Sequence, residues 1–91
     1  MKVHYLIWDK INLKHVARHR FERYDVDEAI LTGKPSFRKW KGQNRYYAYG
    51  RTEAGRYLFV VLEDRGKGQF YVVTARDMVI REKRLYHKAK K

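Results

Sequence analysis

Two apolar runs near the middle of the chain predict a buried β-hairpin. Residues Tyr57–Leu62 are apolar on both alternating faces, which is typical of a central strand that is covered on both sides. The turn Glu63–Gly68 has two glycines, which tolerate the positive φ that hairpin loops need. The run Gln69–Arg76 is again rich in aromatic and β-branched residues and predicts the returning strand.

A basic helix is predicted after this hairpin. Asp77 can cap a helix that starts at Met78. Its cationic face is formed by Arg81, Lys83, Arg84 and Lys88. The hairpin thereby brings Arg76 and a cationic helix to one edge of a small sheet, where we expect the functional site.

The first third of the chain predicts a strand and two helices. Residues Lys2–Trp8 predict a short strand, and Asp9–Arg20 predicts a helix with Asp9 as its cap. The helical period places its apolar side at Leu13, Val16 and Ala17, and beside it a stripe of Asn12, His15 and His19.

The second predicted helix has Asp25 and Glu28 at capping-box spacing. Its buried contacts are expected at Val26, Ala29 and Ile30. Gly33 is expected in the left-handed conformation past the end of this helix, and Pro35 prevents its continuation.

Two further strands are predicted between this helix and the hairpin. Ser36–Lys41 is expected to be an edge strand. Asn44–Arg51 alternates, and one of its faces carries Arg45, Tyr47, Tyr49 and Arg51. If that face is open, it forms a platform for base stacking and phosphate binding; if not, the tyrosines pack against the C-terminal helix. The pattern alone leaves both arrangements open.

The predicted element order is β-α-α-β-β-β-β-α, which defines an α+β fold with one small, largely antiparallel sheet. The 91 residues are expected to form a single domain, 1–91, because a chain of this size has room for one compact core. Residues 88–91 are expected to be a frayed basic tail.

The composition points to an anionic partner. The formal net charge is +12, and aromatic residues make up 15% of the chain, a combination that suits unpaired bases and their phosphates. An anionic membrane or an acidic protein would also fit the charge alone. No signal peptide and no apolar run of bilayer length are present, so a cytoplasmic location without membrane association is expected.

Several kinds of chemistry find no support in the sequence. The absence of cysteine excludes thiolate zinc sites and Cys nucleophiles. His15 and His19 have no third ligand at suitable spacing, and the acidic residues fall at caps and turns, so no metal site is predicted. Ser36 has no visible triad, and Gly66–Gly68 joins two strands rather than opening a helix, which excludes a P-loop. No cofactor is expected.

Metal-free RNA cleavage requires residue types that this chain has. The ribose 2′-OH attacks the adjacent phosphate, a base takes its proton, an acid protonates the leaving 5′-oxygen, and cations stabilise the phosphorane. Histidine can carry either proton near neutral pH, and arginine offers the phosphate a planar fork. A basic aromatic surface that binds RNA or DNA without cutting it is the alternative.

Several motifs resemble the BrnT family of bacterial toxins. The opening Trp8-Asp9, with Asn12, His15-Val16 and His19, is similar to the start of these proteins. Thr74-Ala-Arg76 followed by Arg81-Glu-Lys-Arg-Leu-Tyr86 resembles their C-terminal signature. The strand Lys2–Ile7 is an addition, and Arg20 stands where glycine often follows histidine.

The resemblance implies a RelE-like ribonuclease fold and an endoribonuclease that arrests translation, the toxin of a type II toxin–antitoxin system. It implies as partners RNA and a cognate antitoxin with a ribbon-helix-helix DNA-binding part, in a hetero-oligomer. The matching positions are Asn12, His15, His19, Arg76, Glu82 and Tyr86.

Roles for these positions follow from the resemblance and from the chemistry together. Arg76 is expected on the phosphate, with His15 or His19 in proton transfer and Tyr86 as a further catalytic candidate. Glu82 falls with Met78, Leu85 and Tyr86 on the inward side of its helix, where a paired carboxylate, with Arg76 as partner, is the expected state. RNA-binding residues are expected at Arg45, Tyr47, Tyr49, Arg51, Arg81 and Arg84.

Three hypotheses therefore come from the sequence. The first is a toxin ribonuclease that an antitoxin neutralises by covering the basic face. The second is a module that binds RNA or DNA without cleavage. The third is a charged surface that serves only to recruit an acidic protein.

Overall fold

The computed structural model describes residues 1–40 and 44–89, and its elements follow the predicted order with an added π-helical turn. These elements are β1 (Tyr5–Ile7), α1 (Lys10–Ala17), α2 (Arg23–Asp27), the π-helical turn η1 (Glu28–Thr32), β2 (Ser36–Lys39), β3 (Arg45–Arg51), β4 (Tyr57–Asp64), β5 (Gln69–Asp77) and α3 (Ile80–Ala89).

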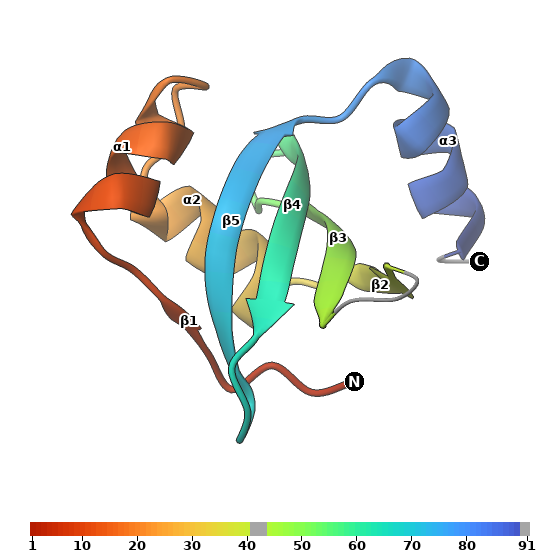
Figure 1. Cartoon of the computed structure of the whole chain (residues 1–91). Coiled ribbons are helices and arrows are strands. Elements are labelled where there is room, and N and C mark those ends of the chain that lie inside the picture. Colours follow the sequence, from red (N-terminus) through yellow and green to blue (C-terminus); the bar gives the residue numbers. More distant parts are fainter. Residues whose placement is uncertain (41–43, 90–91) are drawn as a thin grey trace.

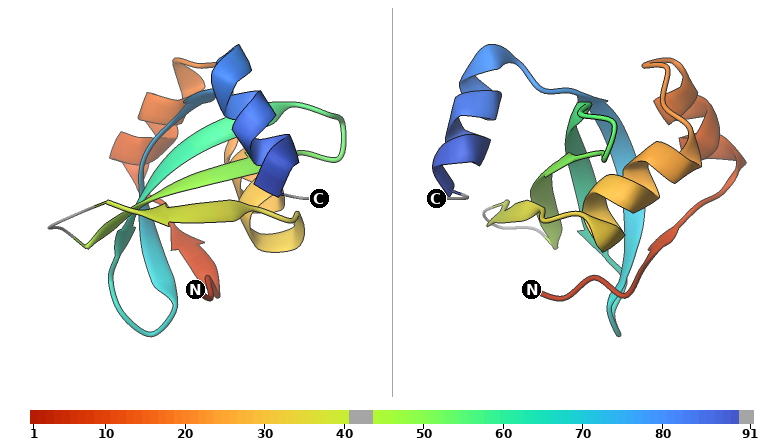
Figure 2. Two further views of the ribbon diagram at one scale, coloured as in Figure 1. Left: turned by 90° about the vertical axis from the view of Figure 1, so that its right-hand side faces the viewer. Right: turned by 180° about the vertical axis from the view of Figure 1, so that it is seen from behind.

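The strands form one five-stranded mixed sheet in the order β1-β5-β4-β3-β2. Strand β1 runs parallel to β5, and the other pairings are antiparallel. Helices α1 and α2 cover one face of this sheet and α3 lies over the other (Figures 1 and 2). The predicted α+β class, the central position of β4 and the edge position of β2 are confirmed.

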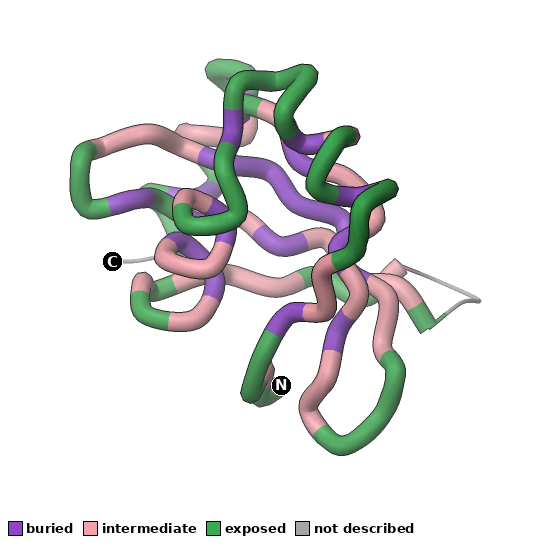
Figure 3. Tube along the Cα trace, turned by 90° about the vertical axis from the view of Figure 1, so that its left-hand side faces the viewer, coloured by how far each residue is buried: buried purple, intermediate pink, exposed green. Residues whose placement is uncertain are grey.

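The two faces of the sheet support two separate apolar clusters. The larger one, beneath α1 and α2, includes Val16, Val26, Ile30, Leu58 and Val72. The smaller one, beneath α3, consists of Phe59, Val61, Met78 and Tyr86 with half-buried rings around them. Buried positions accordingly concentrate along the central strands (Figure 3). Burial on both faces explains why β4 lacks an alternating pattern.

Helix α1 contacts the sheet through different residues from those predicted. Asp9 caps the helix and Val16 is buried, as predicted, but Leu13 and Ala17 are exposed. The position that shares the buried side with Val16, one turn earlier, is the polar Asn12. The prediction was therefore wrong for Leu13 and Ala17. The side chain that is buried beside Val16 is the amide of Asn12, which the prediction had assigned to a stripe beside the apolar side.

The second helix begins earlier than predicted, at Arg23, whereas its π-helical extension η1 ends at Thr32, just before Gly33 as predicted. Its capping box joins Glu22 and Asp25 rather than Asp25 and Glu28. The Glu28 carboxylate instead accepts hydrogen bonds from the Glu53 amide and the Tyr24 hydroxyl. The buried contacts at Val26, Ala29 and Ile30 are confirmed.

Gly33 is extended, with φ −79° and ψ −163°, so the predicted left-handed conformation is wrong. Glycine is required there for space, since a Cβ would lie 2.8 Å from the Ala29 carbonyl oxygen. In the β4–β5 turn, Gly66 and Gly68 do have the predicted positive φ.

The last helix begins two residues later than predicted. Asp77 is the final residue of β5 and pairs with Arg56 through Nε at 3.0 Å, so it does not act as the expected cap. The Glu82 carboxylate accepts the Val79 amide just before the helix. Leu85, expected on the inward side, is 52% exposed.

Two of the predicted segments extend past the residues that the structure describes. Strand β2 ends at Lys39, and position 41 of the predicted strand lies outside the described residues. Helix α3 includes Lys88 and Ala89 of the predicted tail, whose positions 90–91 lie outside them as well. No helix in the described part of the chain is long and apolar enough to cross a membrane.

Replacing Gly50 by alanine should lower the free energy of unfolding by about 1–3 kcal/mol, the usual cost of overpacking a filled core. A Cβ there would lie 2.8 Å from the Ala29 carbonyl oxygen and 3.2 Å from its Cβ, so strand β3 and η1 would have to separate. Urea denaturation measures the change. An unchanged midpoint would show that η1 can move without loss.

Candidate nucleic-acid interface

The sheet face beneath α3 carries a row of four aromatic rings. Trp40 and Tyr47 have ring centroids 5.1 Å apart, Tyr47 and Phe59 are 5.2 Å apart, and Phe59 and Tyr49 are 5.3 Å apart. Alternation along β3 puts both tyrosines on this side, and pairing with β4 sets Phe59 opposite Tyr49, where its ring contacts both tyrosines. Phe59 is buried, whereas the other three rings are half-buried and reach solvent. We call this set the aromatic row.

Cations stand beside two of these rings. The Arg76 guanidinium carbon lies 4.2 Å from the Phe59 centroid, and that of Arg45 lies 6.0 Å from the Trp40 centroid. Arg45 also pairs with Glu63 at 3.5 Å. A cation within about 6 Å of a ring face is attracted by its quadrupole, so one arginine interacts with the Trp40 end of the row and another with Phe59.

The Arg45–Arg51 face is neither fully open nor fully covered by α3. Tyr49 lies beside Leu85 and Tyr86 of α3, which partly cover it. Tyr47 lies further along the strand, and its ring packs against Trp40 and Phe59 while remaining half-buried. Helix α3 therefore lies beside the Tyr49 end of this face, and the Tyr47 part reaches solvent.

Arg76 and Glu82 form the predicted pair. Nη1 and Nη2 of Arg76 donate to the two carboxylate oxygens of Glu82, at 2.8 and 2.9 Å, and Nη1 also donates to the Asp77 carbonyl at 3.0 Å. The hydrogen bonds from Arg76 hold the pKa of Glu82 below its usual value, against the opposing effect of burial. The same bonds raise the pKa of Arg76. Arg76 is thus a fixed, permanently charged group beside the Phe59 ring of the aromatic row.

A second group of polar residues meets at Tyr57. The Tyr57 hydroxyl and Nε2 of His87 share a hydrogen bond of 3.0 Å. The Arg51 guanidinium and the Lys83 ammonium each lie 5.4 Å from the Tyr57 ring centroid. Sequence reasoning missed Tyr57 and His87, although Lys83 and His87 are four residues apart on one helix, a spacing that places them on the same face.

The histidines of α1 are not part of this face. Helix α1 lies on the opposite side of the sheet from α3 (Figure 1), so His15 is separated from Arg76 by the sheet. His19 follows α1 and lies near Asp77 at the end of β5, whose pKa is lowered chiefly by its hydrogen bonds from Arg56 and to a smaller extent by His19. The His19 carbonyl accepts a hydrogen bond from Arg56 at 2.8 Å. The structure therefore brings His19, but not His15, toward the end of the strand that carries Arg76.

Two matched positions have structural partners. Asn12 is 1% exposed, and its amide donates to the Ile7 and Val72 carbonyls at 2.9 and 3.0 Å. Tyr86 is buried, its hydroxyl donates to the Lys34 carbonyl at 3.1 Å, and burial raises its pKa. Arg81 and Arg84 are exposed on α3.

Metal binding has no visible site in the described part of the chain, where no three His, Asp or Glu side chains gather. The groups available on the sheet face beneath α3 are aromatic rings, guanidinium groups and the hydrogen-bonded pair of Tyr57 and His87. Fold and face together define a small α+β domain with a cationic, aromatic sheet surface. Compared with protein-family models, curated proteins and solved structures, the chain has no match.

Proposed function

We propose that this protein binds single-stranded RNA along the aromatic row. The observation that carries the proposal is the placement of three solvent-reaching rings, Trp40, Tyr47 and Tyr49, in one row that is joined through Phe59. Arg45 lies beside the Trp40 ring and Arg76 beside Phe59. Stacked bases would lie on the rings while the phosphates meet the guanidinium groups. The net charge of +12 would attract the RNA from a distance.

We further propose that the bound RNA is cleaved without a metal and that the protein is the toxin of a type II toxin–antitoxin system. The support is the resemblance to the BrnT family in Thr74-Ala-Arg76 and Arg81–Tyr86, together with an element order compatible with a RelE-like fold. In this proposal Arg76 stabilises the phosphorane, a histidine transfers protons, and inhibition of translation follows from loss of RNA. An antitoxin with a ribbon-helix-helix part would cover the basic face.

A module that binds RNA without cleaving it is the second candidate. One observation favours it: His15 lies on the opposite side of the sheet from Arg76, so these two catalytic candidates do not meet. Under this proposal, the aromatic row and its cations serve affinity alone, and binding weakens with salt according to the number of phosphate contacts.

One experiment separates the two candidates. Purified protein is incubated in EDTA with a labelled single-stranded RNA and with its 2′-deoxy counterpart. Fragments ending in 2′,3′-cyclic phosphate from the RNA alone would support the ribonuclease, because only a ribose 2′-OH can form that product. RNA that is bound but stays intact, with ribosomes added as well, would contradict it and leave the binding module.

A pair of matched variants tests the binding surface in the same samples. Tyr47→Leu should weaken RNA binding by roughly tenfold, which corresponds to one lost stacking contact. Tyr24→Leu is the control, because Tyr24 is 66% exposed on α2, on the other side of the sheet. Fluorescence anisotropy with a labelled oligonucleotide measures both. Equal affinities of the two variants would exclude the aromatic row as the binding site.

A further inference from the structure

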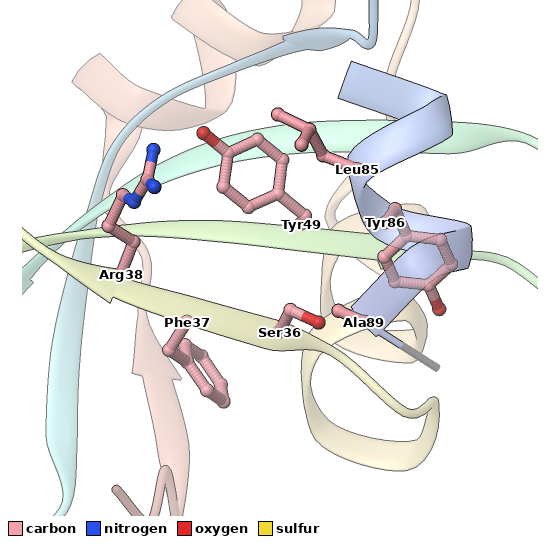
Figure 4. Close-up of a pocket in the computed structure, with 7 residues that line it drawn as sticks. All are labelled: Ser36, Phe37, Arg38, Tyr49, Leu85, Tyr86 and Ala89. Carbon is pink, nitrogen blue, oxygen red and sulfur yellow. The ribbon is translucent and has the colours of Figure 1, made fainter. Parts of the chain in front are cut away.

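A hollow of about 240 Å³ lies between the edge strand β2, strand β3 and helix α3. Leu85 projects from α3 toward the Tyr49 ring, and Arg38 rises from β2 beside that ring (Figure 4). Ser36 and the buried ring of Tyr86 complete the side nearer the C-terminal end of the helix. The walls are thus mostly apolar and aromatic, with a few polar groups among them.

Two polar groups in this hollow, those of Tyr49 and Arg38, can still form a hydrogen bond or an ion pair with a ligand. Within the described residues, the Tyr49 hydroxyl has no hydrogen-bond partner and the Arg38 guanidinium has no ion pair. A tyrosine hydroxyl is protonated near neutral pH and can donate, and burial raises the pKa of Tyr49 further. Ligand sites have this character: apolar walls with a small number of placed polar groups that fix orientation.

Size and charge restrict what the hollow can hold. Pockets for drug-sized ligands measure roughly 300–1,000 Å³, so a volume of about 240 Å³ suits one flat ring system rather than a larger ligand. Arg38 at its edge favours a ligand that carries a negative charge next to that ring. A base with its phosphate has this combination.

The hollow also continues the aromatic row. Tyr49 is the last ring of the row and at the same time a wall of the hollow. The charges of Glu82 and Arg76 both act on the Tyr49 hydroxyl, so the ion pair lies near. A strand of RNA that follows the aromatic row would therefore reach the hollow at the Tyr49 end of the row.

We propose that this hollow holds a single nucleobase of the bound RNA, stacked on Tyr49 against Leu85, with the adjoining phosphate on Arg38. The proposal rests on the proposed RNA binding and adds a specificity site to it, since one base is enclosed while the others lie on an open surface. The ligand class is a nucleotide.

The test uses the full chain and two small probes, 5′-AMP and ribose 5-phosphate, which differ only in the base. Chemical shifts of ¹⁵N-labelled protein should move at Arg38, Tyr49 and Leu85 with 5′-AMP, and binding should be about tenfold or more tighter than that of ribose 5-phosphate. Equal binding of the two probes would overturn the proposal, because the base would then contribute nothing.

A matched pair of variants locates the effect. Leu85→Gln should weaken 5′-AMP binding about three- to fivefold through loss of apolar contact, and folding should be unaffected because Leu85 is half exposed. Leu13→Gln is the control, an exposed leucine on α1 at the other side of the sheet. If both variants bind 5′-AMP as the wild type does, the hollow is not the nucleotide site.

These outcomes are separate from those of the cleavage assay. Binding of 5′-AMP in the hollow together with intact RNA would support the nucleobase site and contradict the ribonuclease. Cleaved RNA together with equal binding of 5′-AMP and ribose 5-phosphate would overturn the nucleobase site and leave the ribonuclease standing.

Discussion

The Asn12→Asp variant is expected to lose about 3 kcal/mol or more of its free energy of unfolding. Asn12 is buried, and its side-chain amide donates to the carbonyls of Ile7 and Val72, which belong to β1 and β5. A carboxylate has no proton to donate at neutral pH and would face both carbonyl oxygens. Each buried polar group left unsatisfied costs about 1–3 kcal/mol, and the buried charge adds to this.

Urea denaturation at neutral pH measures this loss. Asn44→Asp is the matched control, because the Asn44 amide also donates to a backbone carbonyl, that of Asp64, but at an exposed position. It should change the midpoint little. If Asn12→Asp unfolded at the same urea concentration as Asn44→Asp and lost only RNA binding or cleavage, Asn12 would be a functional residue rather than the link between α1 and the sheet.

The Glu82→Gln variant is expected to lose about 1–3 kcal/mol of its free energy of unfolding. Breaking a buried pair by removing one partner costs 3–5 kcal/mol. The Arg76 side chain is 38% exposed, so solvent screens part of the interaction and the expected loss is smaller. Arg23→Gln is the control, since it removes an arginine from the exposed pair with Asp27 and should change stability little.

The pH dependence of this loss follows from the lowered pKa of Glu82. Its usual value is 4.5 and its folded value is lower, because Arg76 stabilises the charged form. The pair therefore contributes its full stability above pH 4.5, and the contribution disappears as pH falls through the folded pKa. The difference between wild type and Glu82→Gln should shrink from pH 7 to pH 3. A difference that stayed constant would show that charge does not matter at this position.

A double-mutant cycle distinguishes the structural role of Arg76 from its proposed role on RNA. Arg76→Gln should cost less stability in the Glu82→Gln background than in the wild type, because the pair is already broken. RNA cleavage should be lost whenever Arg76 is replaced and retained in Glu82→Gln. Equal losses of cleavage in the two single variants would assign Arg76 to structure alone.

The elements of the fold could be predicted because their signals are local. The continuous apolar run Tyr57–Leu62 indicated a strand covered on both faces, and β4 lies at the centre of the sheet. The alternation in Asn44–Arg51 indicated which side chains share a face, and Tyr47 and Tyr49 do so in the aromatic row. Helical spacing indicated that Glu82 would be buried and paired.

Other parts of the site could not be predicted because they depend on contacts across the fold. Asn12 lies in a polar stripe of the helix, and only the carbonyl of Val72, sixty residues away, explains its burial. Gly33 is required by a close approach to Ala29 rather than by its own backbone angles. The pairing of Tyr57 with His87 joins a strand to a helix that pack together only in the folded chain.

Local sequence was enough to predict the order of the elements, the central strand, the basic and aromatic composition and the pairing of Glu82, because periodicity and composition act over neighbouring residues. Tertiary packing placed α1 and α3 on opposite faces of the sheet, which separates His15 from Arg76. It also decided that Tyr49 ends the aromatic row and forms a wall of the hollow beside Leu85. Which face of a sheet a helix covers depends on how the apolar side of the helix packs against strands that are distant in sequence. Local sequence patterns do not specify that face.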